Sequence, residues 1–450
     1  MSEKEIGVLI LTLGVIVGLV QVLGYVFERL KQPRLVGEII AGILIGPFVL
    51  GQVSPAVFRL LFENPAAGGQ NKTSIVLGFV YWLGILLLMF ISGSHVRRLL
   101  SRENRRETAW ILGVGTPLPF FLVLGLGLAS IIPIDPLVGV KGVKTATLLV
   151  LASAVAVTSI PVISRIFHDL KILHTRFASL VLGFAVLEDI VLWGVLAVAT
   201  ALANSTSLSE QNVLTSTSIH LATTLIYMVA GLTVLPGVLK RVRLLRRNLL
   251  YKSSPLAYAI CVLFAYVGIA AYLDVNLVFA AFLAGFGLAG GIAGDERQYF
   301  TEALDAIHRF SFSVFIPVYF ALVGYRLVFG REFSFAMFVA VLIGSSLVAL
   351  ASRGLAAKLA GFQKLDILNL AIATNARGGP GIVMASVAYE AGIISAAFYT
   401  ALVLTAIVTS QAAGMWLRFV LSKGWPLLST NPDETGLRIA VPANVQTPAA

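Results

Sequence analysis

The chain has 450 residues, of which 58% are hydrophobic and 12% are charged, whereas an average soluble domain carries about 25% charged residues. Its single cysteine, Cys261, excludes a disulfide framework and a cysteine metal cluster. The net charge of +11 does not indicate a nucleic-acid partner, because the basic residues fall in short runs between apolar segments, as in membrane proteins.

Hydropathy predicts an all-α polytopic membrane protein with about 13 transmembrane helices, embedded in a lipid bilayer. A helix needs roughly 20 residues to cross a bilayer. The first apolar run lacks a basic region before it, which predicts a retained span and not a cleaved signal peptide. The predicted spans cover residues 6–27, 34–50, 75–94, 108–132, 146–167, 177–203, 213–239, 255–273, 275–293, 310–328, 334–357, 366–389 and 395–421.

Basic residues gather at alternate junctions between these spans, including residues 28–34, 95–106, 165–176 and 240–252. The positive-inside rule then predicts an outside N-terminus and a cytoplasmic C-terminus, and we expect a plasma (inner) membrane location. Residues 424–450 contain Pro, Asn, Thr and Ala without an apolar period. This composition predicts a disordered cytoplasmic tail after a transmembrane domain that covers residues 1–423.

The fifth span contains two hydroxyl residues, Thr158 and Ser159, just before Pro161. A proline within a span removes a backbone hydrogen bond. Neighbouring hydroxyl groups can satisfy the freed backbone groups or coordinate an ion. The residues alone leave both roles open.

The sixth span carries two adjacent carboxylates, Glu188 and Asp189, in its apolar middle. An ionised carboxylate near the centre of a span costs about 2.5–3.5 kcal/mol on insertion scales. Two in a row predict a site inside the membrane for an ion or a proton. No cofactor motif appears with its required context.

The twelfth span is also interrupted, at Asn375 and at the run Gly378, Gly379 and Pro380. Gly-Gly-Pro cannot continue a regular helix without a break. Interrupted spans at corresponding places in two halves of a chain indicate inverted repeats with the binding site between them. The fifth and twelfth spans therefore predict such a site.

Two arginines lie within the apolar runs and are candidates to neutralise the carboxylates: Arg353 and Arg377. For Arg353, a position at a helix end with its charge reaching the interface is an equal alternative. Glu38 lies near the start of the second span, where the helix dipole favours an acid. We take it as a supporting candidate.

Together these residues resemble the monovalent cation:proton antiporters, most closely the cation:proton antiporter-2 family. The resemblance implies a homodimer in which a scaffold of about residues 6–94 and 213–328 carries a moving core of about residues 108–203 and 334–421, with the broken fifth and twelfth helices crossing at mid-membrane. The matching motifs are residues 32–47, 156–165, 187–190, 315–324 and 375–378.

The resemblance also implies roles for single residues. Asp189 matches the family's ion-binding aspartate, and Thr158 matches the unwound segment near the ion, as does Ser159. Arg353 and Arg377 fall where members carry basic residues in the eleventh and twelfth spans.

The sequence departs from the family pattern in two places. Ser94 stands where many members have an acid. Glu188 stands where electrogenic members have a second aspartate and electroneutral ones a neutral residue. The Glu-Asp pair therefore leaves the stoichiometry open.

The sequence thus predicts a secondary antiporter, not an enzyme, that exchanges Na⁺ or K⁺ for H⁺ by alternating access. Proton and cation would compete for Asp189, and the two adjacent acids favour electrogenic exchange. The alternatives are a partner-gated cation efflux channel, a sodium-coupled organic-anion symporter and a membrane-embedded sensor scaffold. A channel needs a continuous pore, and a symporter needs an anion site at half-helix N-termini.

Overall fold

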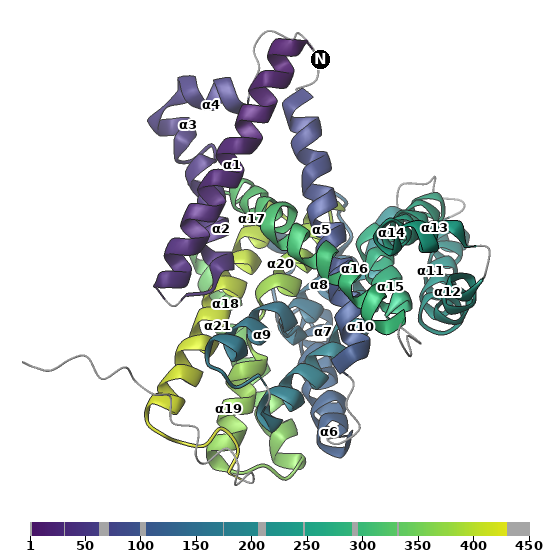
Figure 1. Cartoon of the computed structure of the whole chain (residues 1–450). Coiled ribbons are helices and arrows are strands. Elements are labelled where there is room, and N and C mark those ends of the chain that lie inside the picture. Colours follow the sequence, from purple (N-terminus) through teal and green to yellow (C-terminus); the bar gives the residue numbers. More distant parts are fainter. Residues whose placement is uncertain are drawn as a thin grey trace, which may run out of the picture.

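The computed structural model describes residues 2–30, 32–62, 72–99, 105–173, 175–205, 213–245, 248–289, 296–330 and 333–429. This described part is almost entirely helical (Figure 1). Its β-structure is one isolated bridge between Val138 and Ile394. The predicted all-α class is therefore confirmed.

The described helices follow in chain order, with η1 a 3₁₀ turn and η3 and η4 π-helical turns. They are α1 (Glu3–Arg29), α2 (Arg34–Ile45), α3 (Leu50–Val53), α4 (Pro55–Phe62), α5 (Lys72–Leu99), α6 (Arg105–Gly115), α7 (Pro117–Leu128), η1 (Asp135–Leu137), α8 (Lys144–Ala156), α9 (Ile160–Asp169), α10 (Arg176–Ser205), α11 (Val213–Val229), η3 (Ala230–Val234), α12 (Leu235–Leu244), α13 (Leu249–Ser253), α14 (Pro255–Tyr272), α15 (Leu277–Leu288), α16 (Glu296–Phe310), η4 (Ser311–Phe315), α17 (Ile316–Tyr325), α18 (Phe335–Leu359), α19 (Lys364–Thr374), α20 (Gly378–Glu390) and α21 (Ala396–Ser422).

Ten helical segments in the described part are long and apolar enough to cross a membrane. They correspond to ten of the 13 predicted spans. The other three predicted spans contain no helix of that length, because two of them are broken (α8–α9 and α19–α20) and the third, α15, has 12 residues. The count of 13 is not confirmed and stays a prediction.

Most of the helix packing falls into two groups. In the first bundle α1, α2, α5 and α14–α17 pack on one another, most extensively α5 on α15 and α2 on α17. In the second bundle α6–α10 and α18–α21 do so, most extensively α6 on α18 and α7 on α8. The segment α11–α13 packs on both through α10 and α15, and it lies to the right with α14 in Figure 1.

Glycines bring α5 and α15 into backbone contact. A Cβ atom on Gly285 would lie 1.9 Å from the carbonyl oxygen of Phe90, and one on Gly93 would lie 2.0 Å from that of Phe282. No side chain fits at such distances, so glycine allows the close approach that membrane helices use in place of a hydrophobic driving force. The first bundle is therefore held tightly at this contact.

Residues 424–429, which composition assigns to the tail, pack against α19. Asp366 accepts hydrogen bonds from the backbone N–H and the hydroxyl of Ser429, at 2.8 and 2.7 Å. The amide of Asn369 donates to the carbonyl oxygen of Leu427 at 3.1 Å. The rest of the predicted tail, residues 430–450, lies outside the described residues.

Candidate ion-binding site

Two helices are broken in the spans for which the sequence predicts it, but the run Gly378 to Pro380, expected to be interrupted, begins the helix α20, and the break precedes it. The backbone is not helical at residues 157–159, between α8 and α9, or at residues 375–377, between α19 and α20. Pro161 is the second residue of α9 and Pro380 is the third of α20. Proline is tolerated there because the first N–H groups of a helix have no partner within it.

The two breaks lie against each other and exchange hydrogen bonds. The backbone N–H of Ser159 donates to the carbonyl oxygen of Ala376 at 2.6 Å. The Thr158 hydroxyl donates to the carbonyl oxygen of Thr374 at 2.7 Å, and the backbone N–H of Gly379 donates to Ser159 Oγ at 3.1 Å. Each break thus satisfies polar groups that the other leaves unpaired, as buried backbone requires in a membrane.

Gly378 lies at the contact between the two breaks. A Cβ atom there would lie 2.3 Å from Val162 Cγ2 and 2.7 Å from Ser159 Oγ. Its own N–H donates to Ser410 Oγ at 2.9 Å. A larger residue would push α9 away from α20, so this glycine fixes the crossing.

The adjacent carboxylates of α10 have different surroundings, although both side chains are fully buried. Glu188 Oε1 accepts a hydrogen bond from the Thr116 hydroxyl at 2.9 Å and lies 3.6 Å from Arg353 Nη2. Neither carboxylate oxygen of Asp189 has a hydrogen-bond donor among the described residues. Neighbours on a helix point about 100° apart, which lets one acid bind structural partners while the other does not.

Arg353 connects Glu188 to the first break. Its Nη2 also donates to the carbonyl oxygen of Ala156, the last residue of α8. A guanidinium at a helix C-terminus satisfies the unpaired carbonyl and complements the helix dipole. Glu188 therefore balances a cation that caps a broken helix.

Arg377 has a different environment from Arg353. Its guanidinium donates to Ser345 Oγ and, at 3.2 Å, to Asn375 Oδ1. Asn375 therefore lies beside Arg377 within the same break. Of the two candidate arginines, Arg353 is the one that pairs with Glu188.

Sequence reasoning missed three polar partners of the site: Thr116, Ser345 and Ser410. Thr116 lies between α6 and α7, directly before Pro117. A hydroxyl residue before a proline within a span is the same signal that identifies Thr158, and it was available in the sequence. The other two serines carry no such signal.

A cavity of about 750 Å³ lies between the two bundles at one end, here called the cavity end. Its wall includes Arg34 and Glu38 of α2, Ser179 of α10 and Phe320 of α17. It extends to Gly379 of α20 and so reaches the broken helices. At the rim Arg165, with 45% of its side chain exposed, pairs with Glu28.

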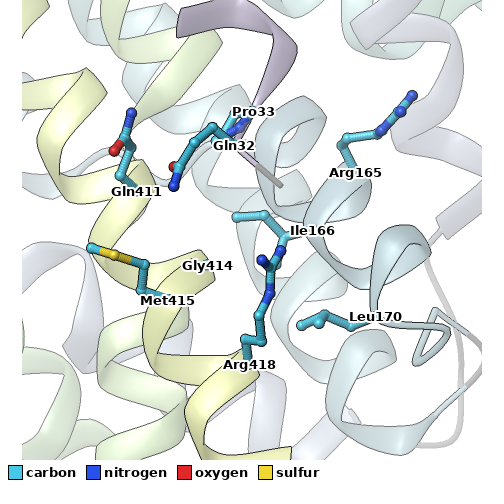
Figure 2. Close-up of a pocket in the computed structure, with 9 residues that line it drawn as sticks. All are labelled: Gln32, Pro33, Arg165, Ile166, Leu170, Gln411, Gly414, Met415 and Arg418. Atoms are coloured by element: carbon cyan, nitrogen blue, oxygen red, sulfur yellow. The ribbon is translucent and has the colours of Figure 1, made fainter. Parts of the chain in front are cut away.

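A second, smaller pocket adjoins this cavity (Figure 2). Its volume is about 30 Å³, which suffices for about two water molecules. Pro33 and Arg165 line both spaces. The small pocket therefore lies beside the cavity end. Its lining residues are Gln32, Pro33, Arg165, Ile166, Leu170, Gln411, Gly414, Met415 and Arg418.

At the opposite end the two bundles are joined by direct bonds, here called the end contacts. One of their residues is Arg326, which follows α17. Within the first bundle its guanidinium lies 4.0 Å from the centre of the Tyr81 ring of α5. The bonds between the bundles hold them together at this end. The end contacts are the Arg326–Glu390 ion pair and hydrogen bonds from the Tyr319 hydroxyl to Ser386 Oγ (3.2 Å), from the Tyr399 hydroxyl to the Val323 carbonyl (3.4 Å) and from the Val328 N–H to Thr400 Oγ1 (3.0 Å).

Comparison with known proteins agrees with this architecture. K⁺/H⁺ antiporter 1 of Saccharomyces cerevisiae is 29% identical over 85% of this chain and 43% of its own length. The Na⁺/H⁺-K⁺ antiporter GerN of Bacillus cereus is 24% identical over 87% of this chain and 90% of its own. The chain thus spans less than half of the yeast relative and nearly all of the bacterial one.

A solved structure shares the fold. The sodium proton antiporter MjNhaP1 from Methanocaldococcus jannaschii superposes with a TM-score of 0.59 at 15% identity, over 92% of this chain and 96% of that one. The family described as sodium/hydrogen exchanger, transmembrane, matches residues 15–423, which is nearly the whole helical part. The chain therefore belongs to the family of transmembrane sodium/hydrogen exchangers.

Proposed function

We propose that this protein is a secondary active antiporter that exchanges Na⁺ or K⁺ for H⁺. One observation carries the proposal: Asp189 is fully buried on a membrane helix, and neither carboxylate oxygen has a hydrogen-bond donor in the described part of the chain. Its helix, α10, packs against α8, α9, α19 and α20, the four halves of the broken helices. The yeast and bacterial relatives are both named as cation/proton antiporters.

The mechanism is competition for Asp189. A bare buried carboxylate has a desolvation cost of several kcal/mol, which opposes any movement that keeps it in the apolar interior. A bound proton or a bound cation removes that cost, so the site moves when either is present. This condition couples the two fluxes and prevents leak.

Alternating access follows from the asymmetry between the two ends. The cavity at one end and the end contacts at the other describe a state open to one side. The core of about residues 108–203 and 334–421 would move against the scaffold of about residues 6–94 and 213–328. The proposed core contains the helices of the second bundle. The proposed scaffold contains those of the first bundle together with α3, α4 and α11–α13.

The cavity end faces the cytoplasm in this proposal. Pro33, Arg34 and Arg165 line the cavity and belong to basic junctions, which the positive-inside rule places on the cytoplasmic side. The N-terminus is then outside and the C-terminus inside, in a plasma (inner) membrane. We also propose a homodimer, as the family resemblance implies.

Proteoliposomes test the function directly. The purified protein is reconstituted with a trapped pH-sensitive dye and an acidic interior, and Na⁺, K⁺ and Li⁺ are added in turn. We expect dequenching with Na⁺ or K⁺. Ion currents far above a turnover-limited flux would support the channel. Sodium-driven uptake of a labelled organic anion would support the symporter. A dye signal that none of the three cations changes would reject antiport.

The hydroxyls of Thr158 and Ser159 provide a second test. Both bond across the breaks. Thr158 Oγ1 is a donor there and keeps its lone pairs for a dehydrated cation. Ser159 Oγ accepts from the N–H groups of Gly379 and Val162, at 3.1 and 3.4 Å, and would exchange one of these hydrogen bonds for the ion. We expect the double alanine variant to raise the apparent cation KM more than it lowers the maximal exchange rate. The control is Thr405→Ala, a buried hydroxyl of α21. An unchanged KM in the double variant would restrict the two hydroxyls to satisfying the breaks.

The stoichiometry depends on whether Glu188 releases Arg353. Arg353 is bound to both Glu188 and the end of α8, which favours a permanently charged Glu188 and one-for-one exchange, against the electrogenic expectation from two adjacent acids. We predict exchange rates that do not respond to an imposed potassium-diffusion potential. An electrogenic cycle would gain about 2.3 kcal/mol per 100 mV of membrane potential. The prediction would be contradicted by exchange rates that rise with the imposed voltage in the wild type and no longer do so in Glu188→Gln.

A further inference from the structure

Glu38 takes no part in the site described above, yet it lines the path that leads there. It lies on α2 with only 7% of its side chain exposed, and it forms part of the wall of the large cavity. Its Oε1 accepts a hydrogen bond from Arg34 Nε at 3.2 Å, and Arg34 also donates to Gln21 Oε1. A buried acid and a basic residue therefore face the cavity as a pair.

The balance of charge around this cavity depends on Glu38. Apart from His308, the charged residues that the described part of the chain contributes to its wall are Arg34, Arg165 and Glu38. Arg165 pairs with Glu28 at the rim, where both side chains are more than a third exposed. Arg34 relies on Glu38 in a more buried position, where charges are screened less by salt. Without Glu38 the wall would carry only positive charge along the path to Gly379.

We propose that Glu38 is a charge-compensating residue of the cytoplasmic access path, which neutralises Arg34 and so keeps the cavity attractive to a monovalent cation. The inference rests on the proposed antiport function and deepens it. Focused charge of one sign in a cleft changes the local concentration of the ion that enters. Glu38 therefore acts on cation capture and not on the exchange step at Asp189.

The test is the apparent cation KM in proteoliposomes for four variants: Glu38→Gln, Arg34→Gln, their double variant and Glu38→Asp. Glu38→Gln keeps the shape of the side chain and removes its charge. We expect its KM to rise roughly tenfold at low ionic strength, with the maximal rate unchanged within about twofold. Added choline chloride should shrink the effect. The double variant should bring the KM most of the way back to the wild-type value, because it removes the uncompensated arginine. Glu38→Asp keeps the charge, so its KM should stay near wild type.

Glu28→Gln is the matched control, because it removes an ion pair of Arg165 at an exposed position, where such a pair contributes little. Wild-type protein that exchanges no cation would reject the proposed function itself. Wild-type exchange with an unchanged KM in Glu38→Gln would reject only the role of Glu38. A raised KM that the double variant does not recover would show that Glu38 instead supports the structure of α2, and this would also overturn the inference.

Discussion

Asp189→Asn is expected to abolish cation-dependent proton movement while the protein still folds and inserts. Asparagine keeps nearly the size and shape of the aspartate, but it neither takes up a proton nor offers a negative charge to a cation. The variant should retain less than about a tenth of wild-type exchange, which corresponds to a loss of at least about 1.4 kcal/mol. Dye dequenching in proteoliposomes, together with the yield of monodisperse protein in detergent, measures both expectations.

The control for this variant is Asp366→Asn. Asp366 is also buried, but it lies in the first turn of α19, at the end away from the break. Its oxygens accept hydrogen bonds from Ser429. Its loss should lower stability and leave the cation dependence of exchange in place. Exchange above a tenth of the wild-type rate in Asp189→Asn would show that Asp189 is not the residue that binds the proton and the cation. Glu188 would then be the remaining candidate carboxylate.

Locking the end contacts is expected to stop transport completely and reversibly. The Val328 N–H lies 3.0 Å from Thr400 Oγ1, so cysteines at these two neighbouring positions are within reach of a short, reducible thiol cross-linker that joins the two bundles. If the bundles must separate there to open the second side of the membrane, exchange should fall below about a tenth when the cysteines are cross-linked and return on reduction.

The lock requires a background without the native thiol, Cys261→Ala, because that cysteine is exposed. The control pair is Thr147→Cys with Ile393→Cys, at a hydrogen bond of 2.8 Å within the second bundle. A cross-link there joins parts that move together and should leave exchange intact. Full activity of the cross-linked Val328–Thr400 pair would contradict alternating access by separation of these bundles.

The breaks could be predicted from sequence because their causes are local. Pro161 and Pro380 cannot donate the backbone hydrogen bond that would continue the preceding helix, so each helix breaks a few residues before its proline, whatever surrounds it. The burial of Glu188 and Asp189 followed from the apolar run around them. The family could be identified because these signals occur together and in order.

The pairing of charges could not be predicted, because it depends on how far side chains reach between helices. Arg353 and Arg377 were both candidates in the sequence, with an equal alternative for Arg353, and only packing shows that Arg353 contacts Glu188 while Arg377 contacts Ser345. The cavity and the end contacts join residues far apart in the chain, such as Arg326 and Glu390. Hydropathy also assigns α8–α9 and α19–α20 as single spans, because it measures composition and not helix continuity.

The central claim is that a proton and a cation compete for the carboxylate of Asp189. The most direct measurement is the number of protons released when Na⁺ or K⁺ binds to the purified protein, obtained by titration calorimetry in buffers of different ionisation enthalpy. The account predicts proton release on cation binding to the wild type and neither release nor binding in Asp189→Asn. Cation binding without proton release, or release that persists in Asp189→Asn, would contradict it.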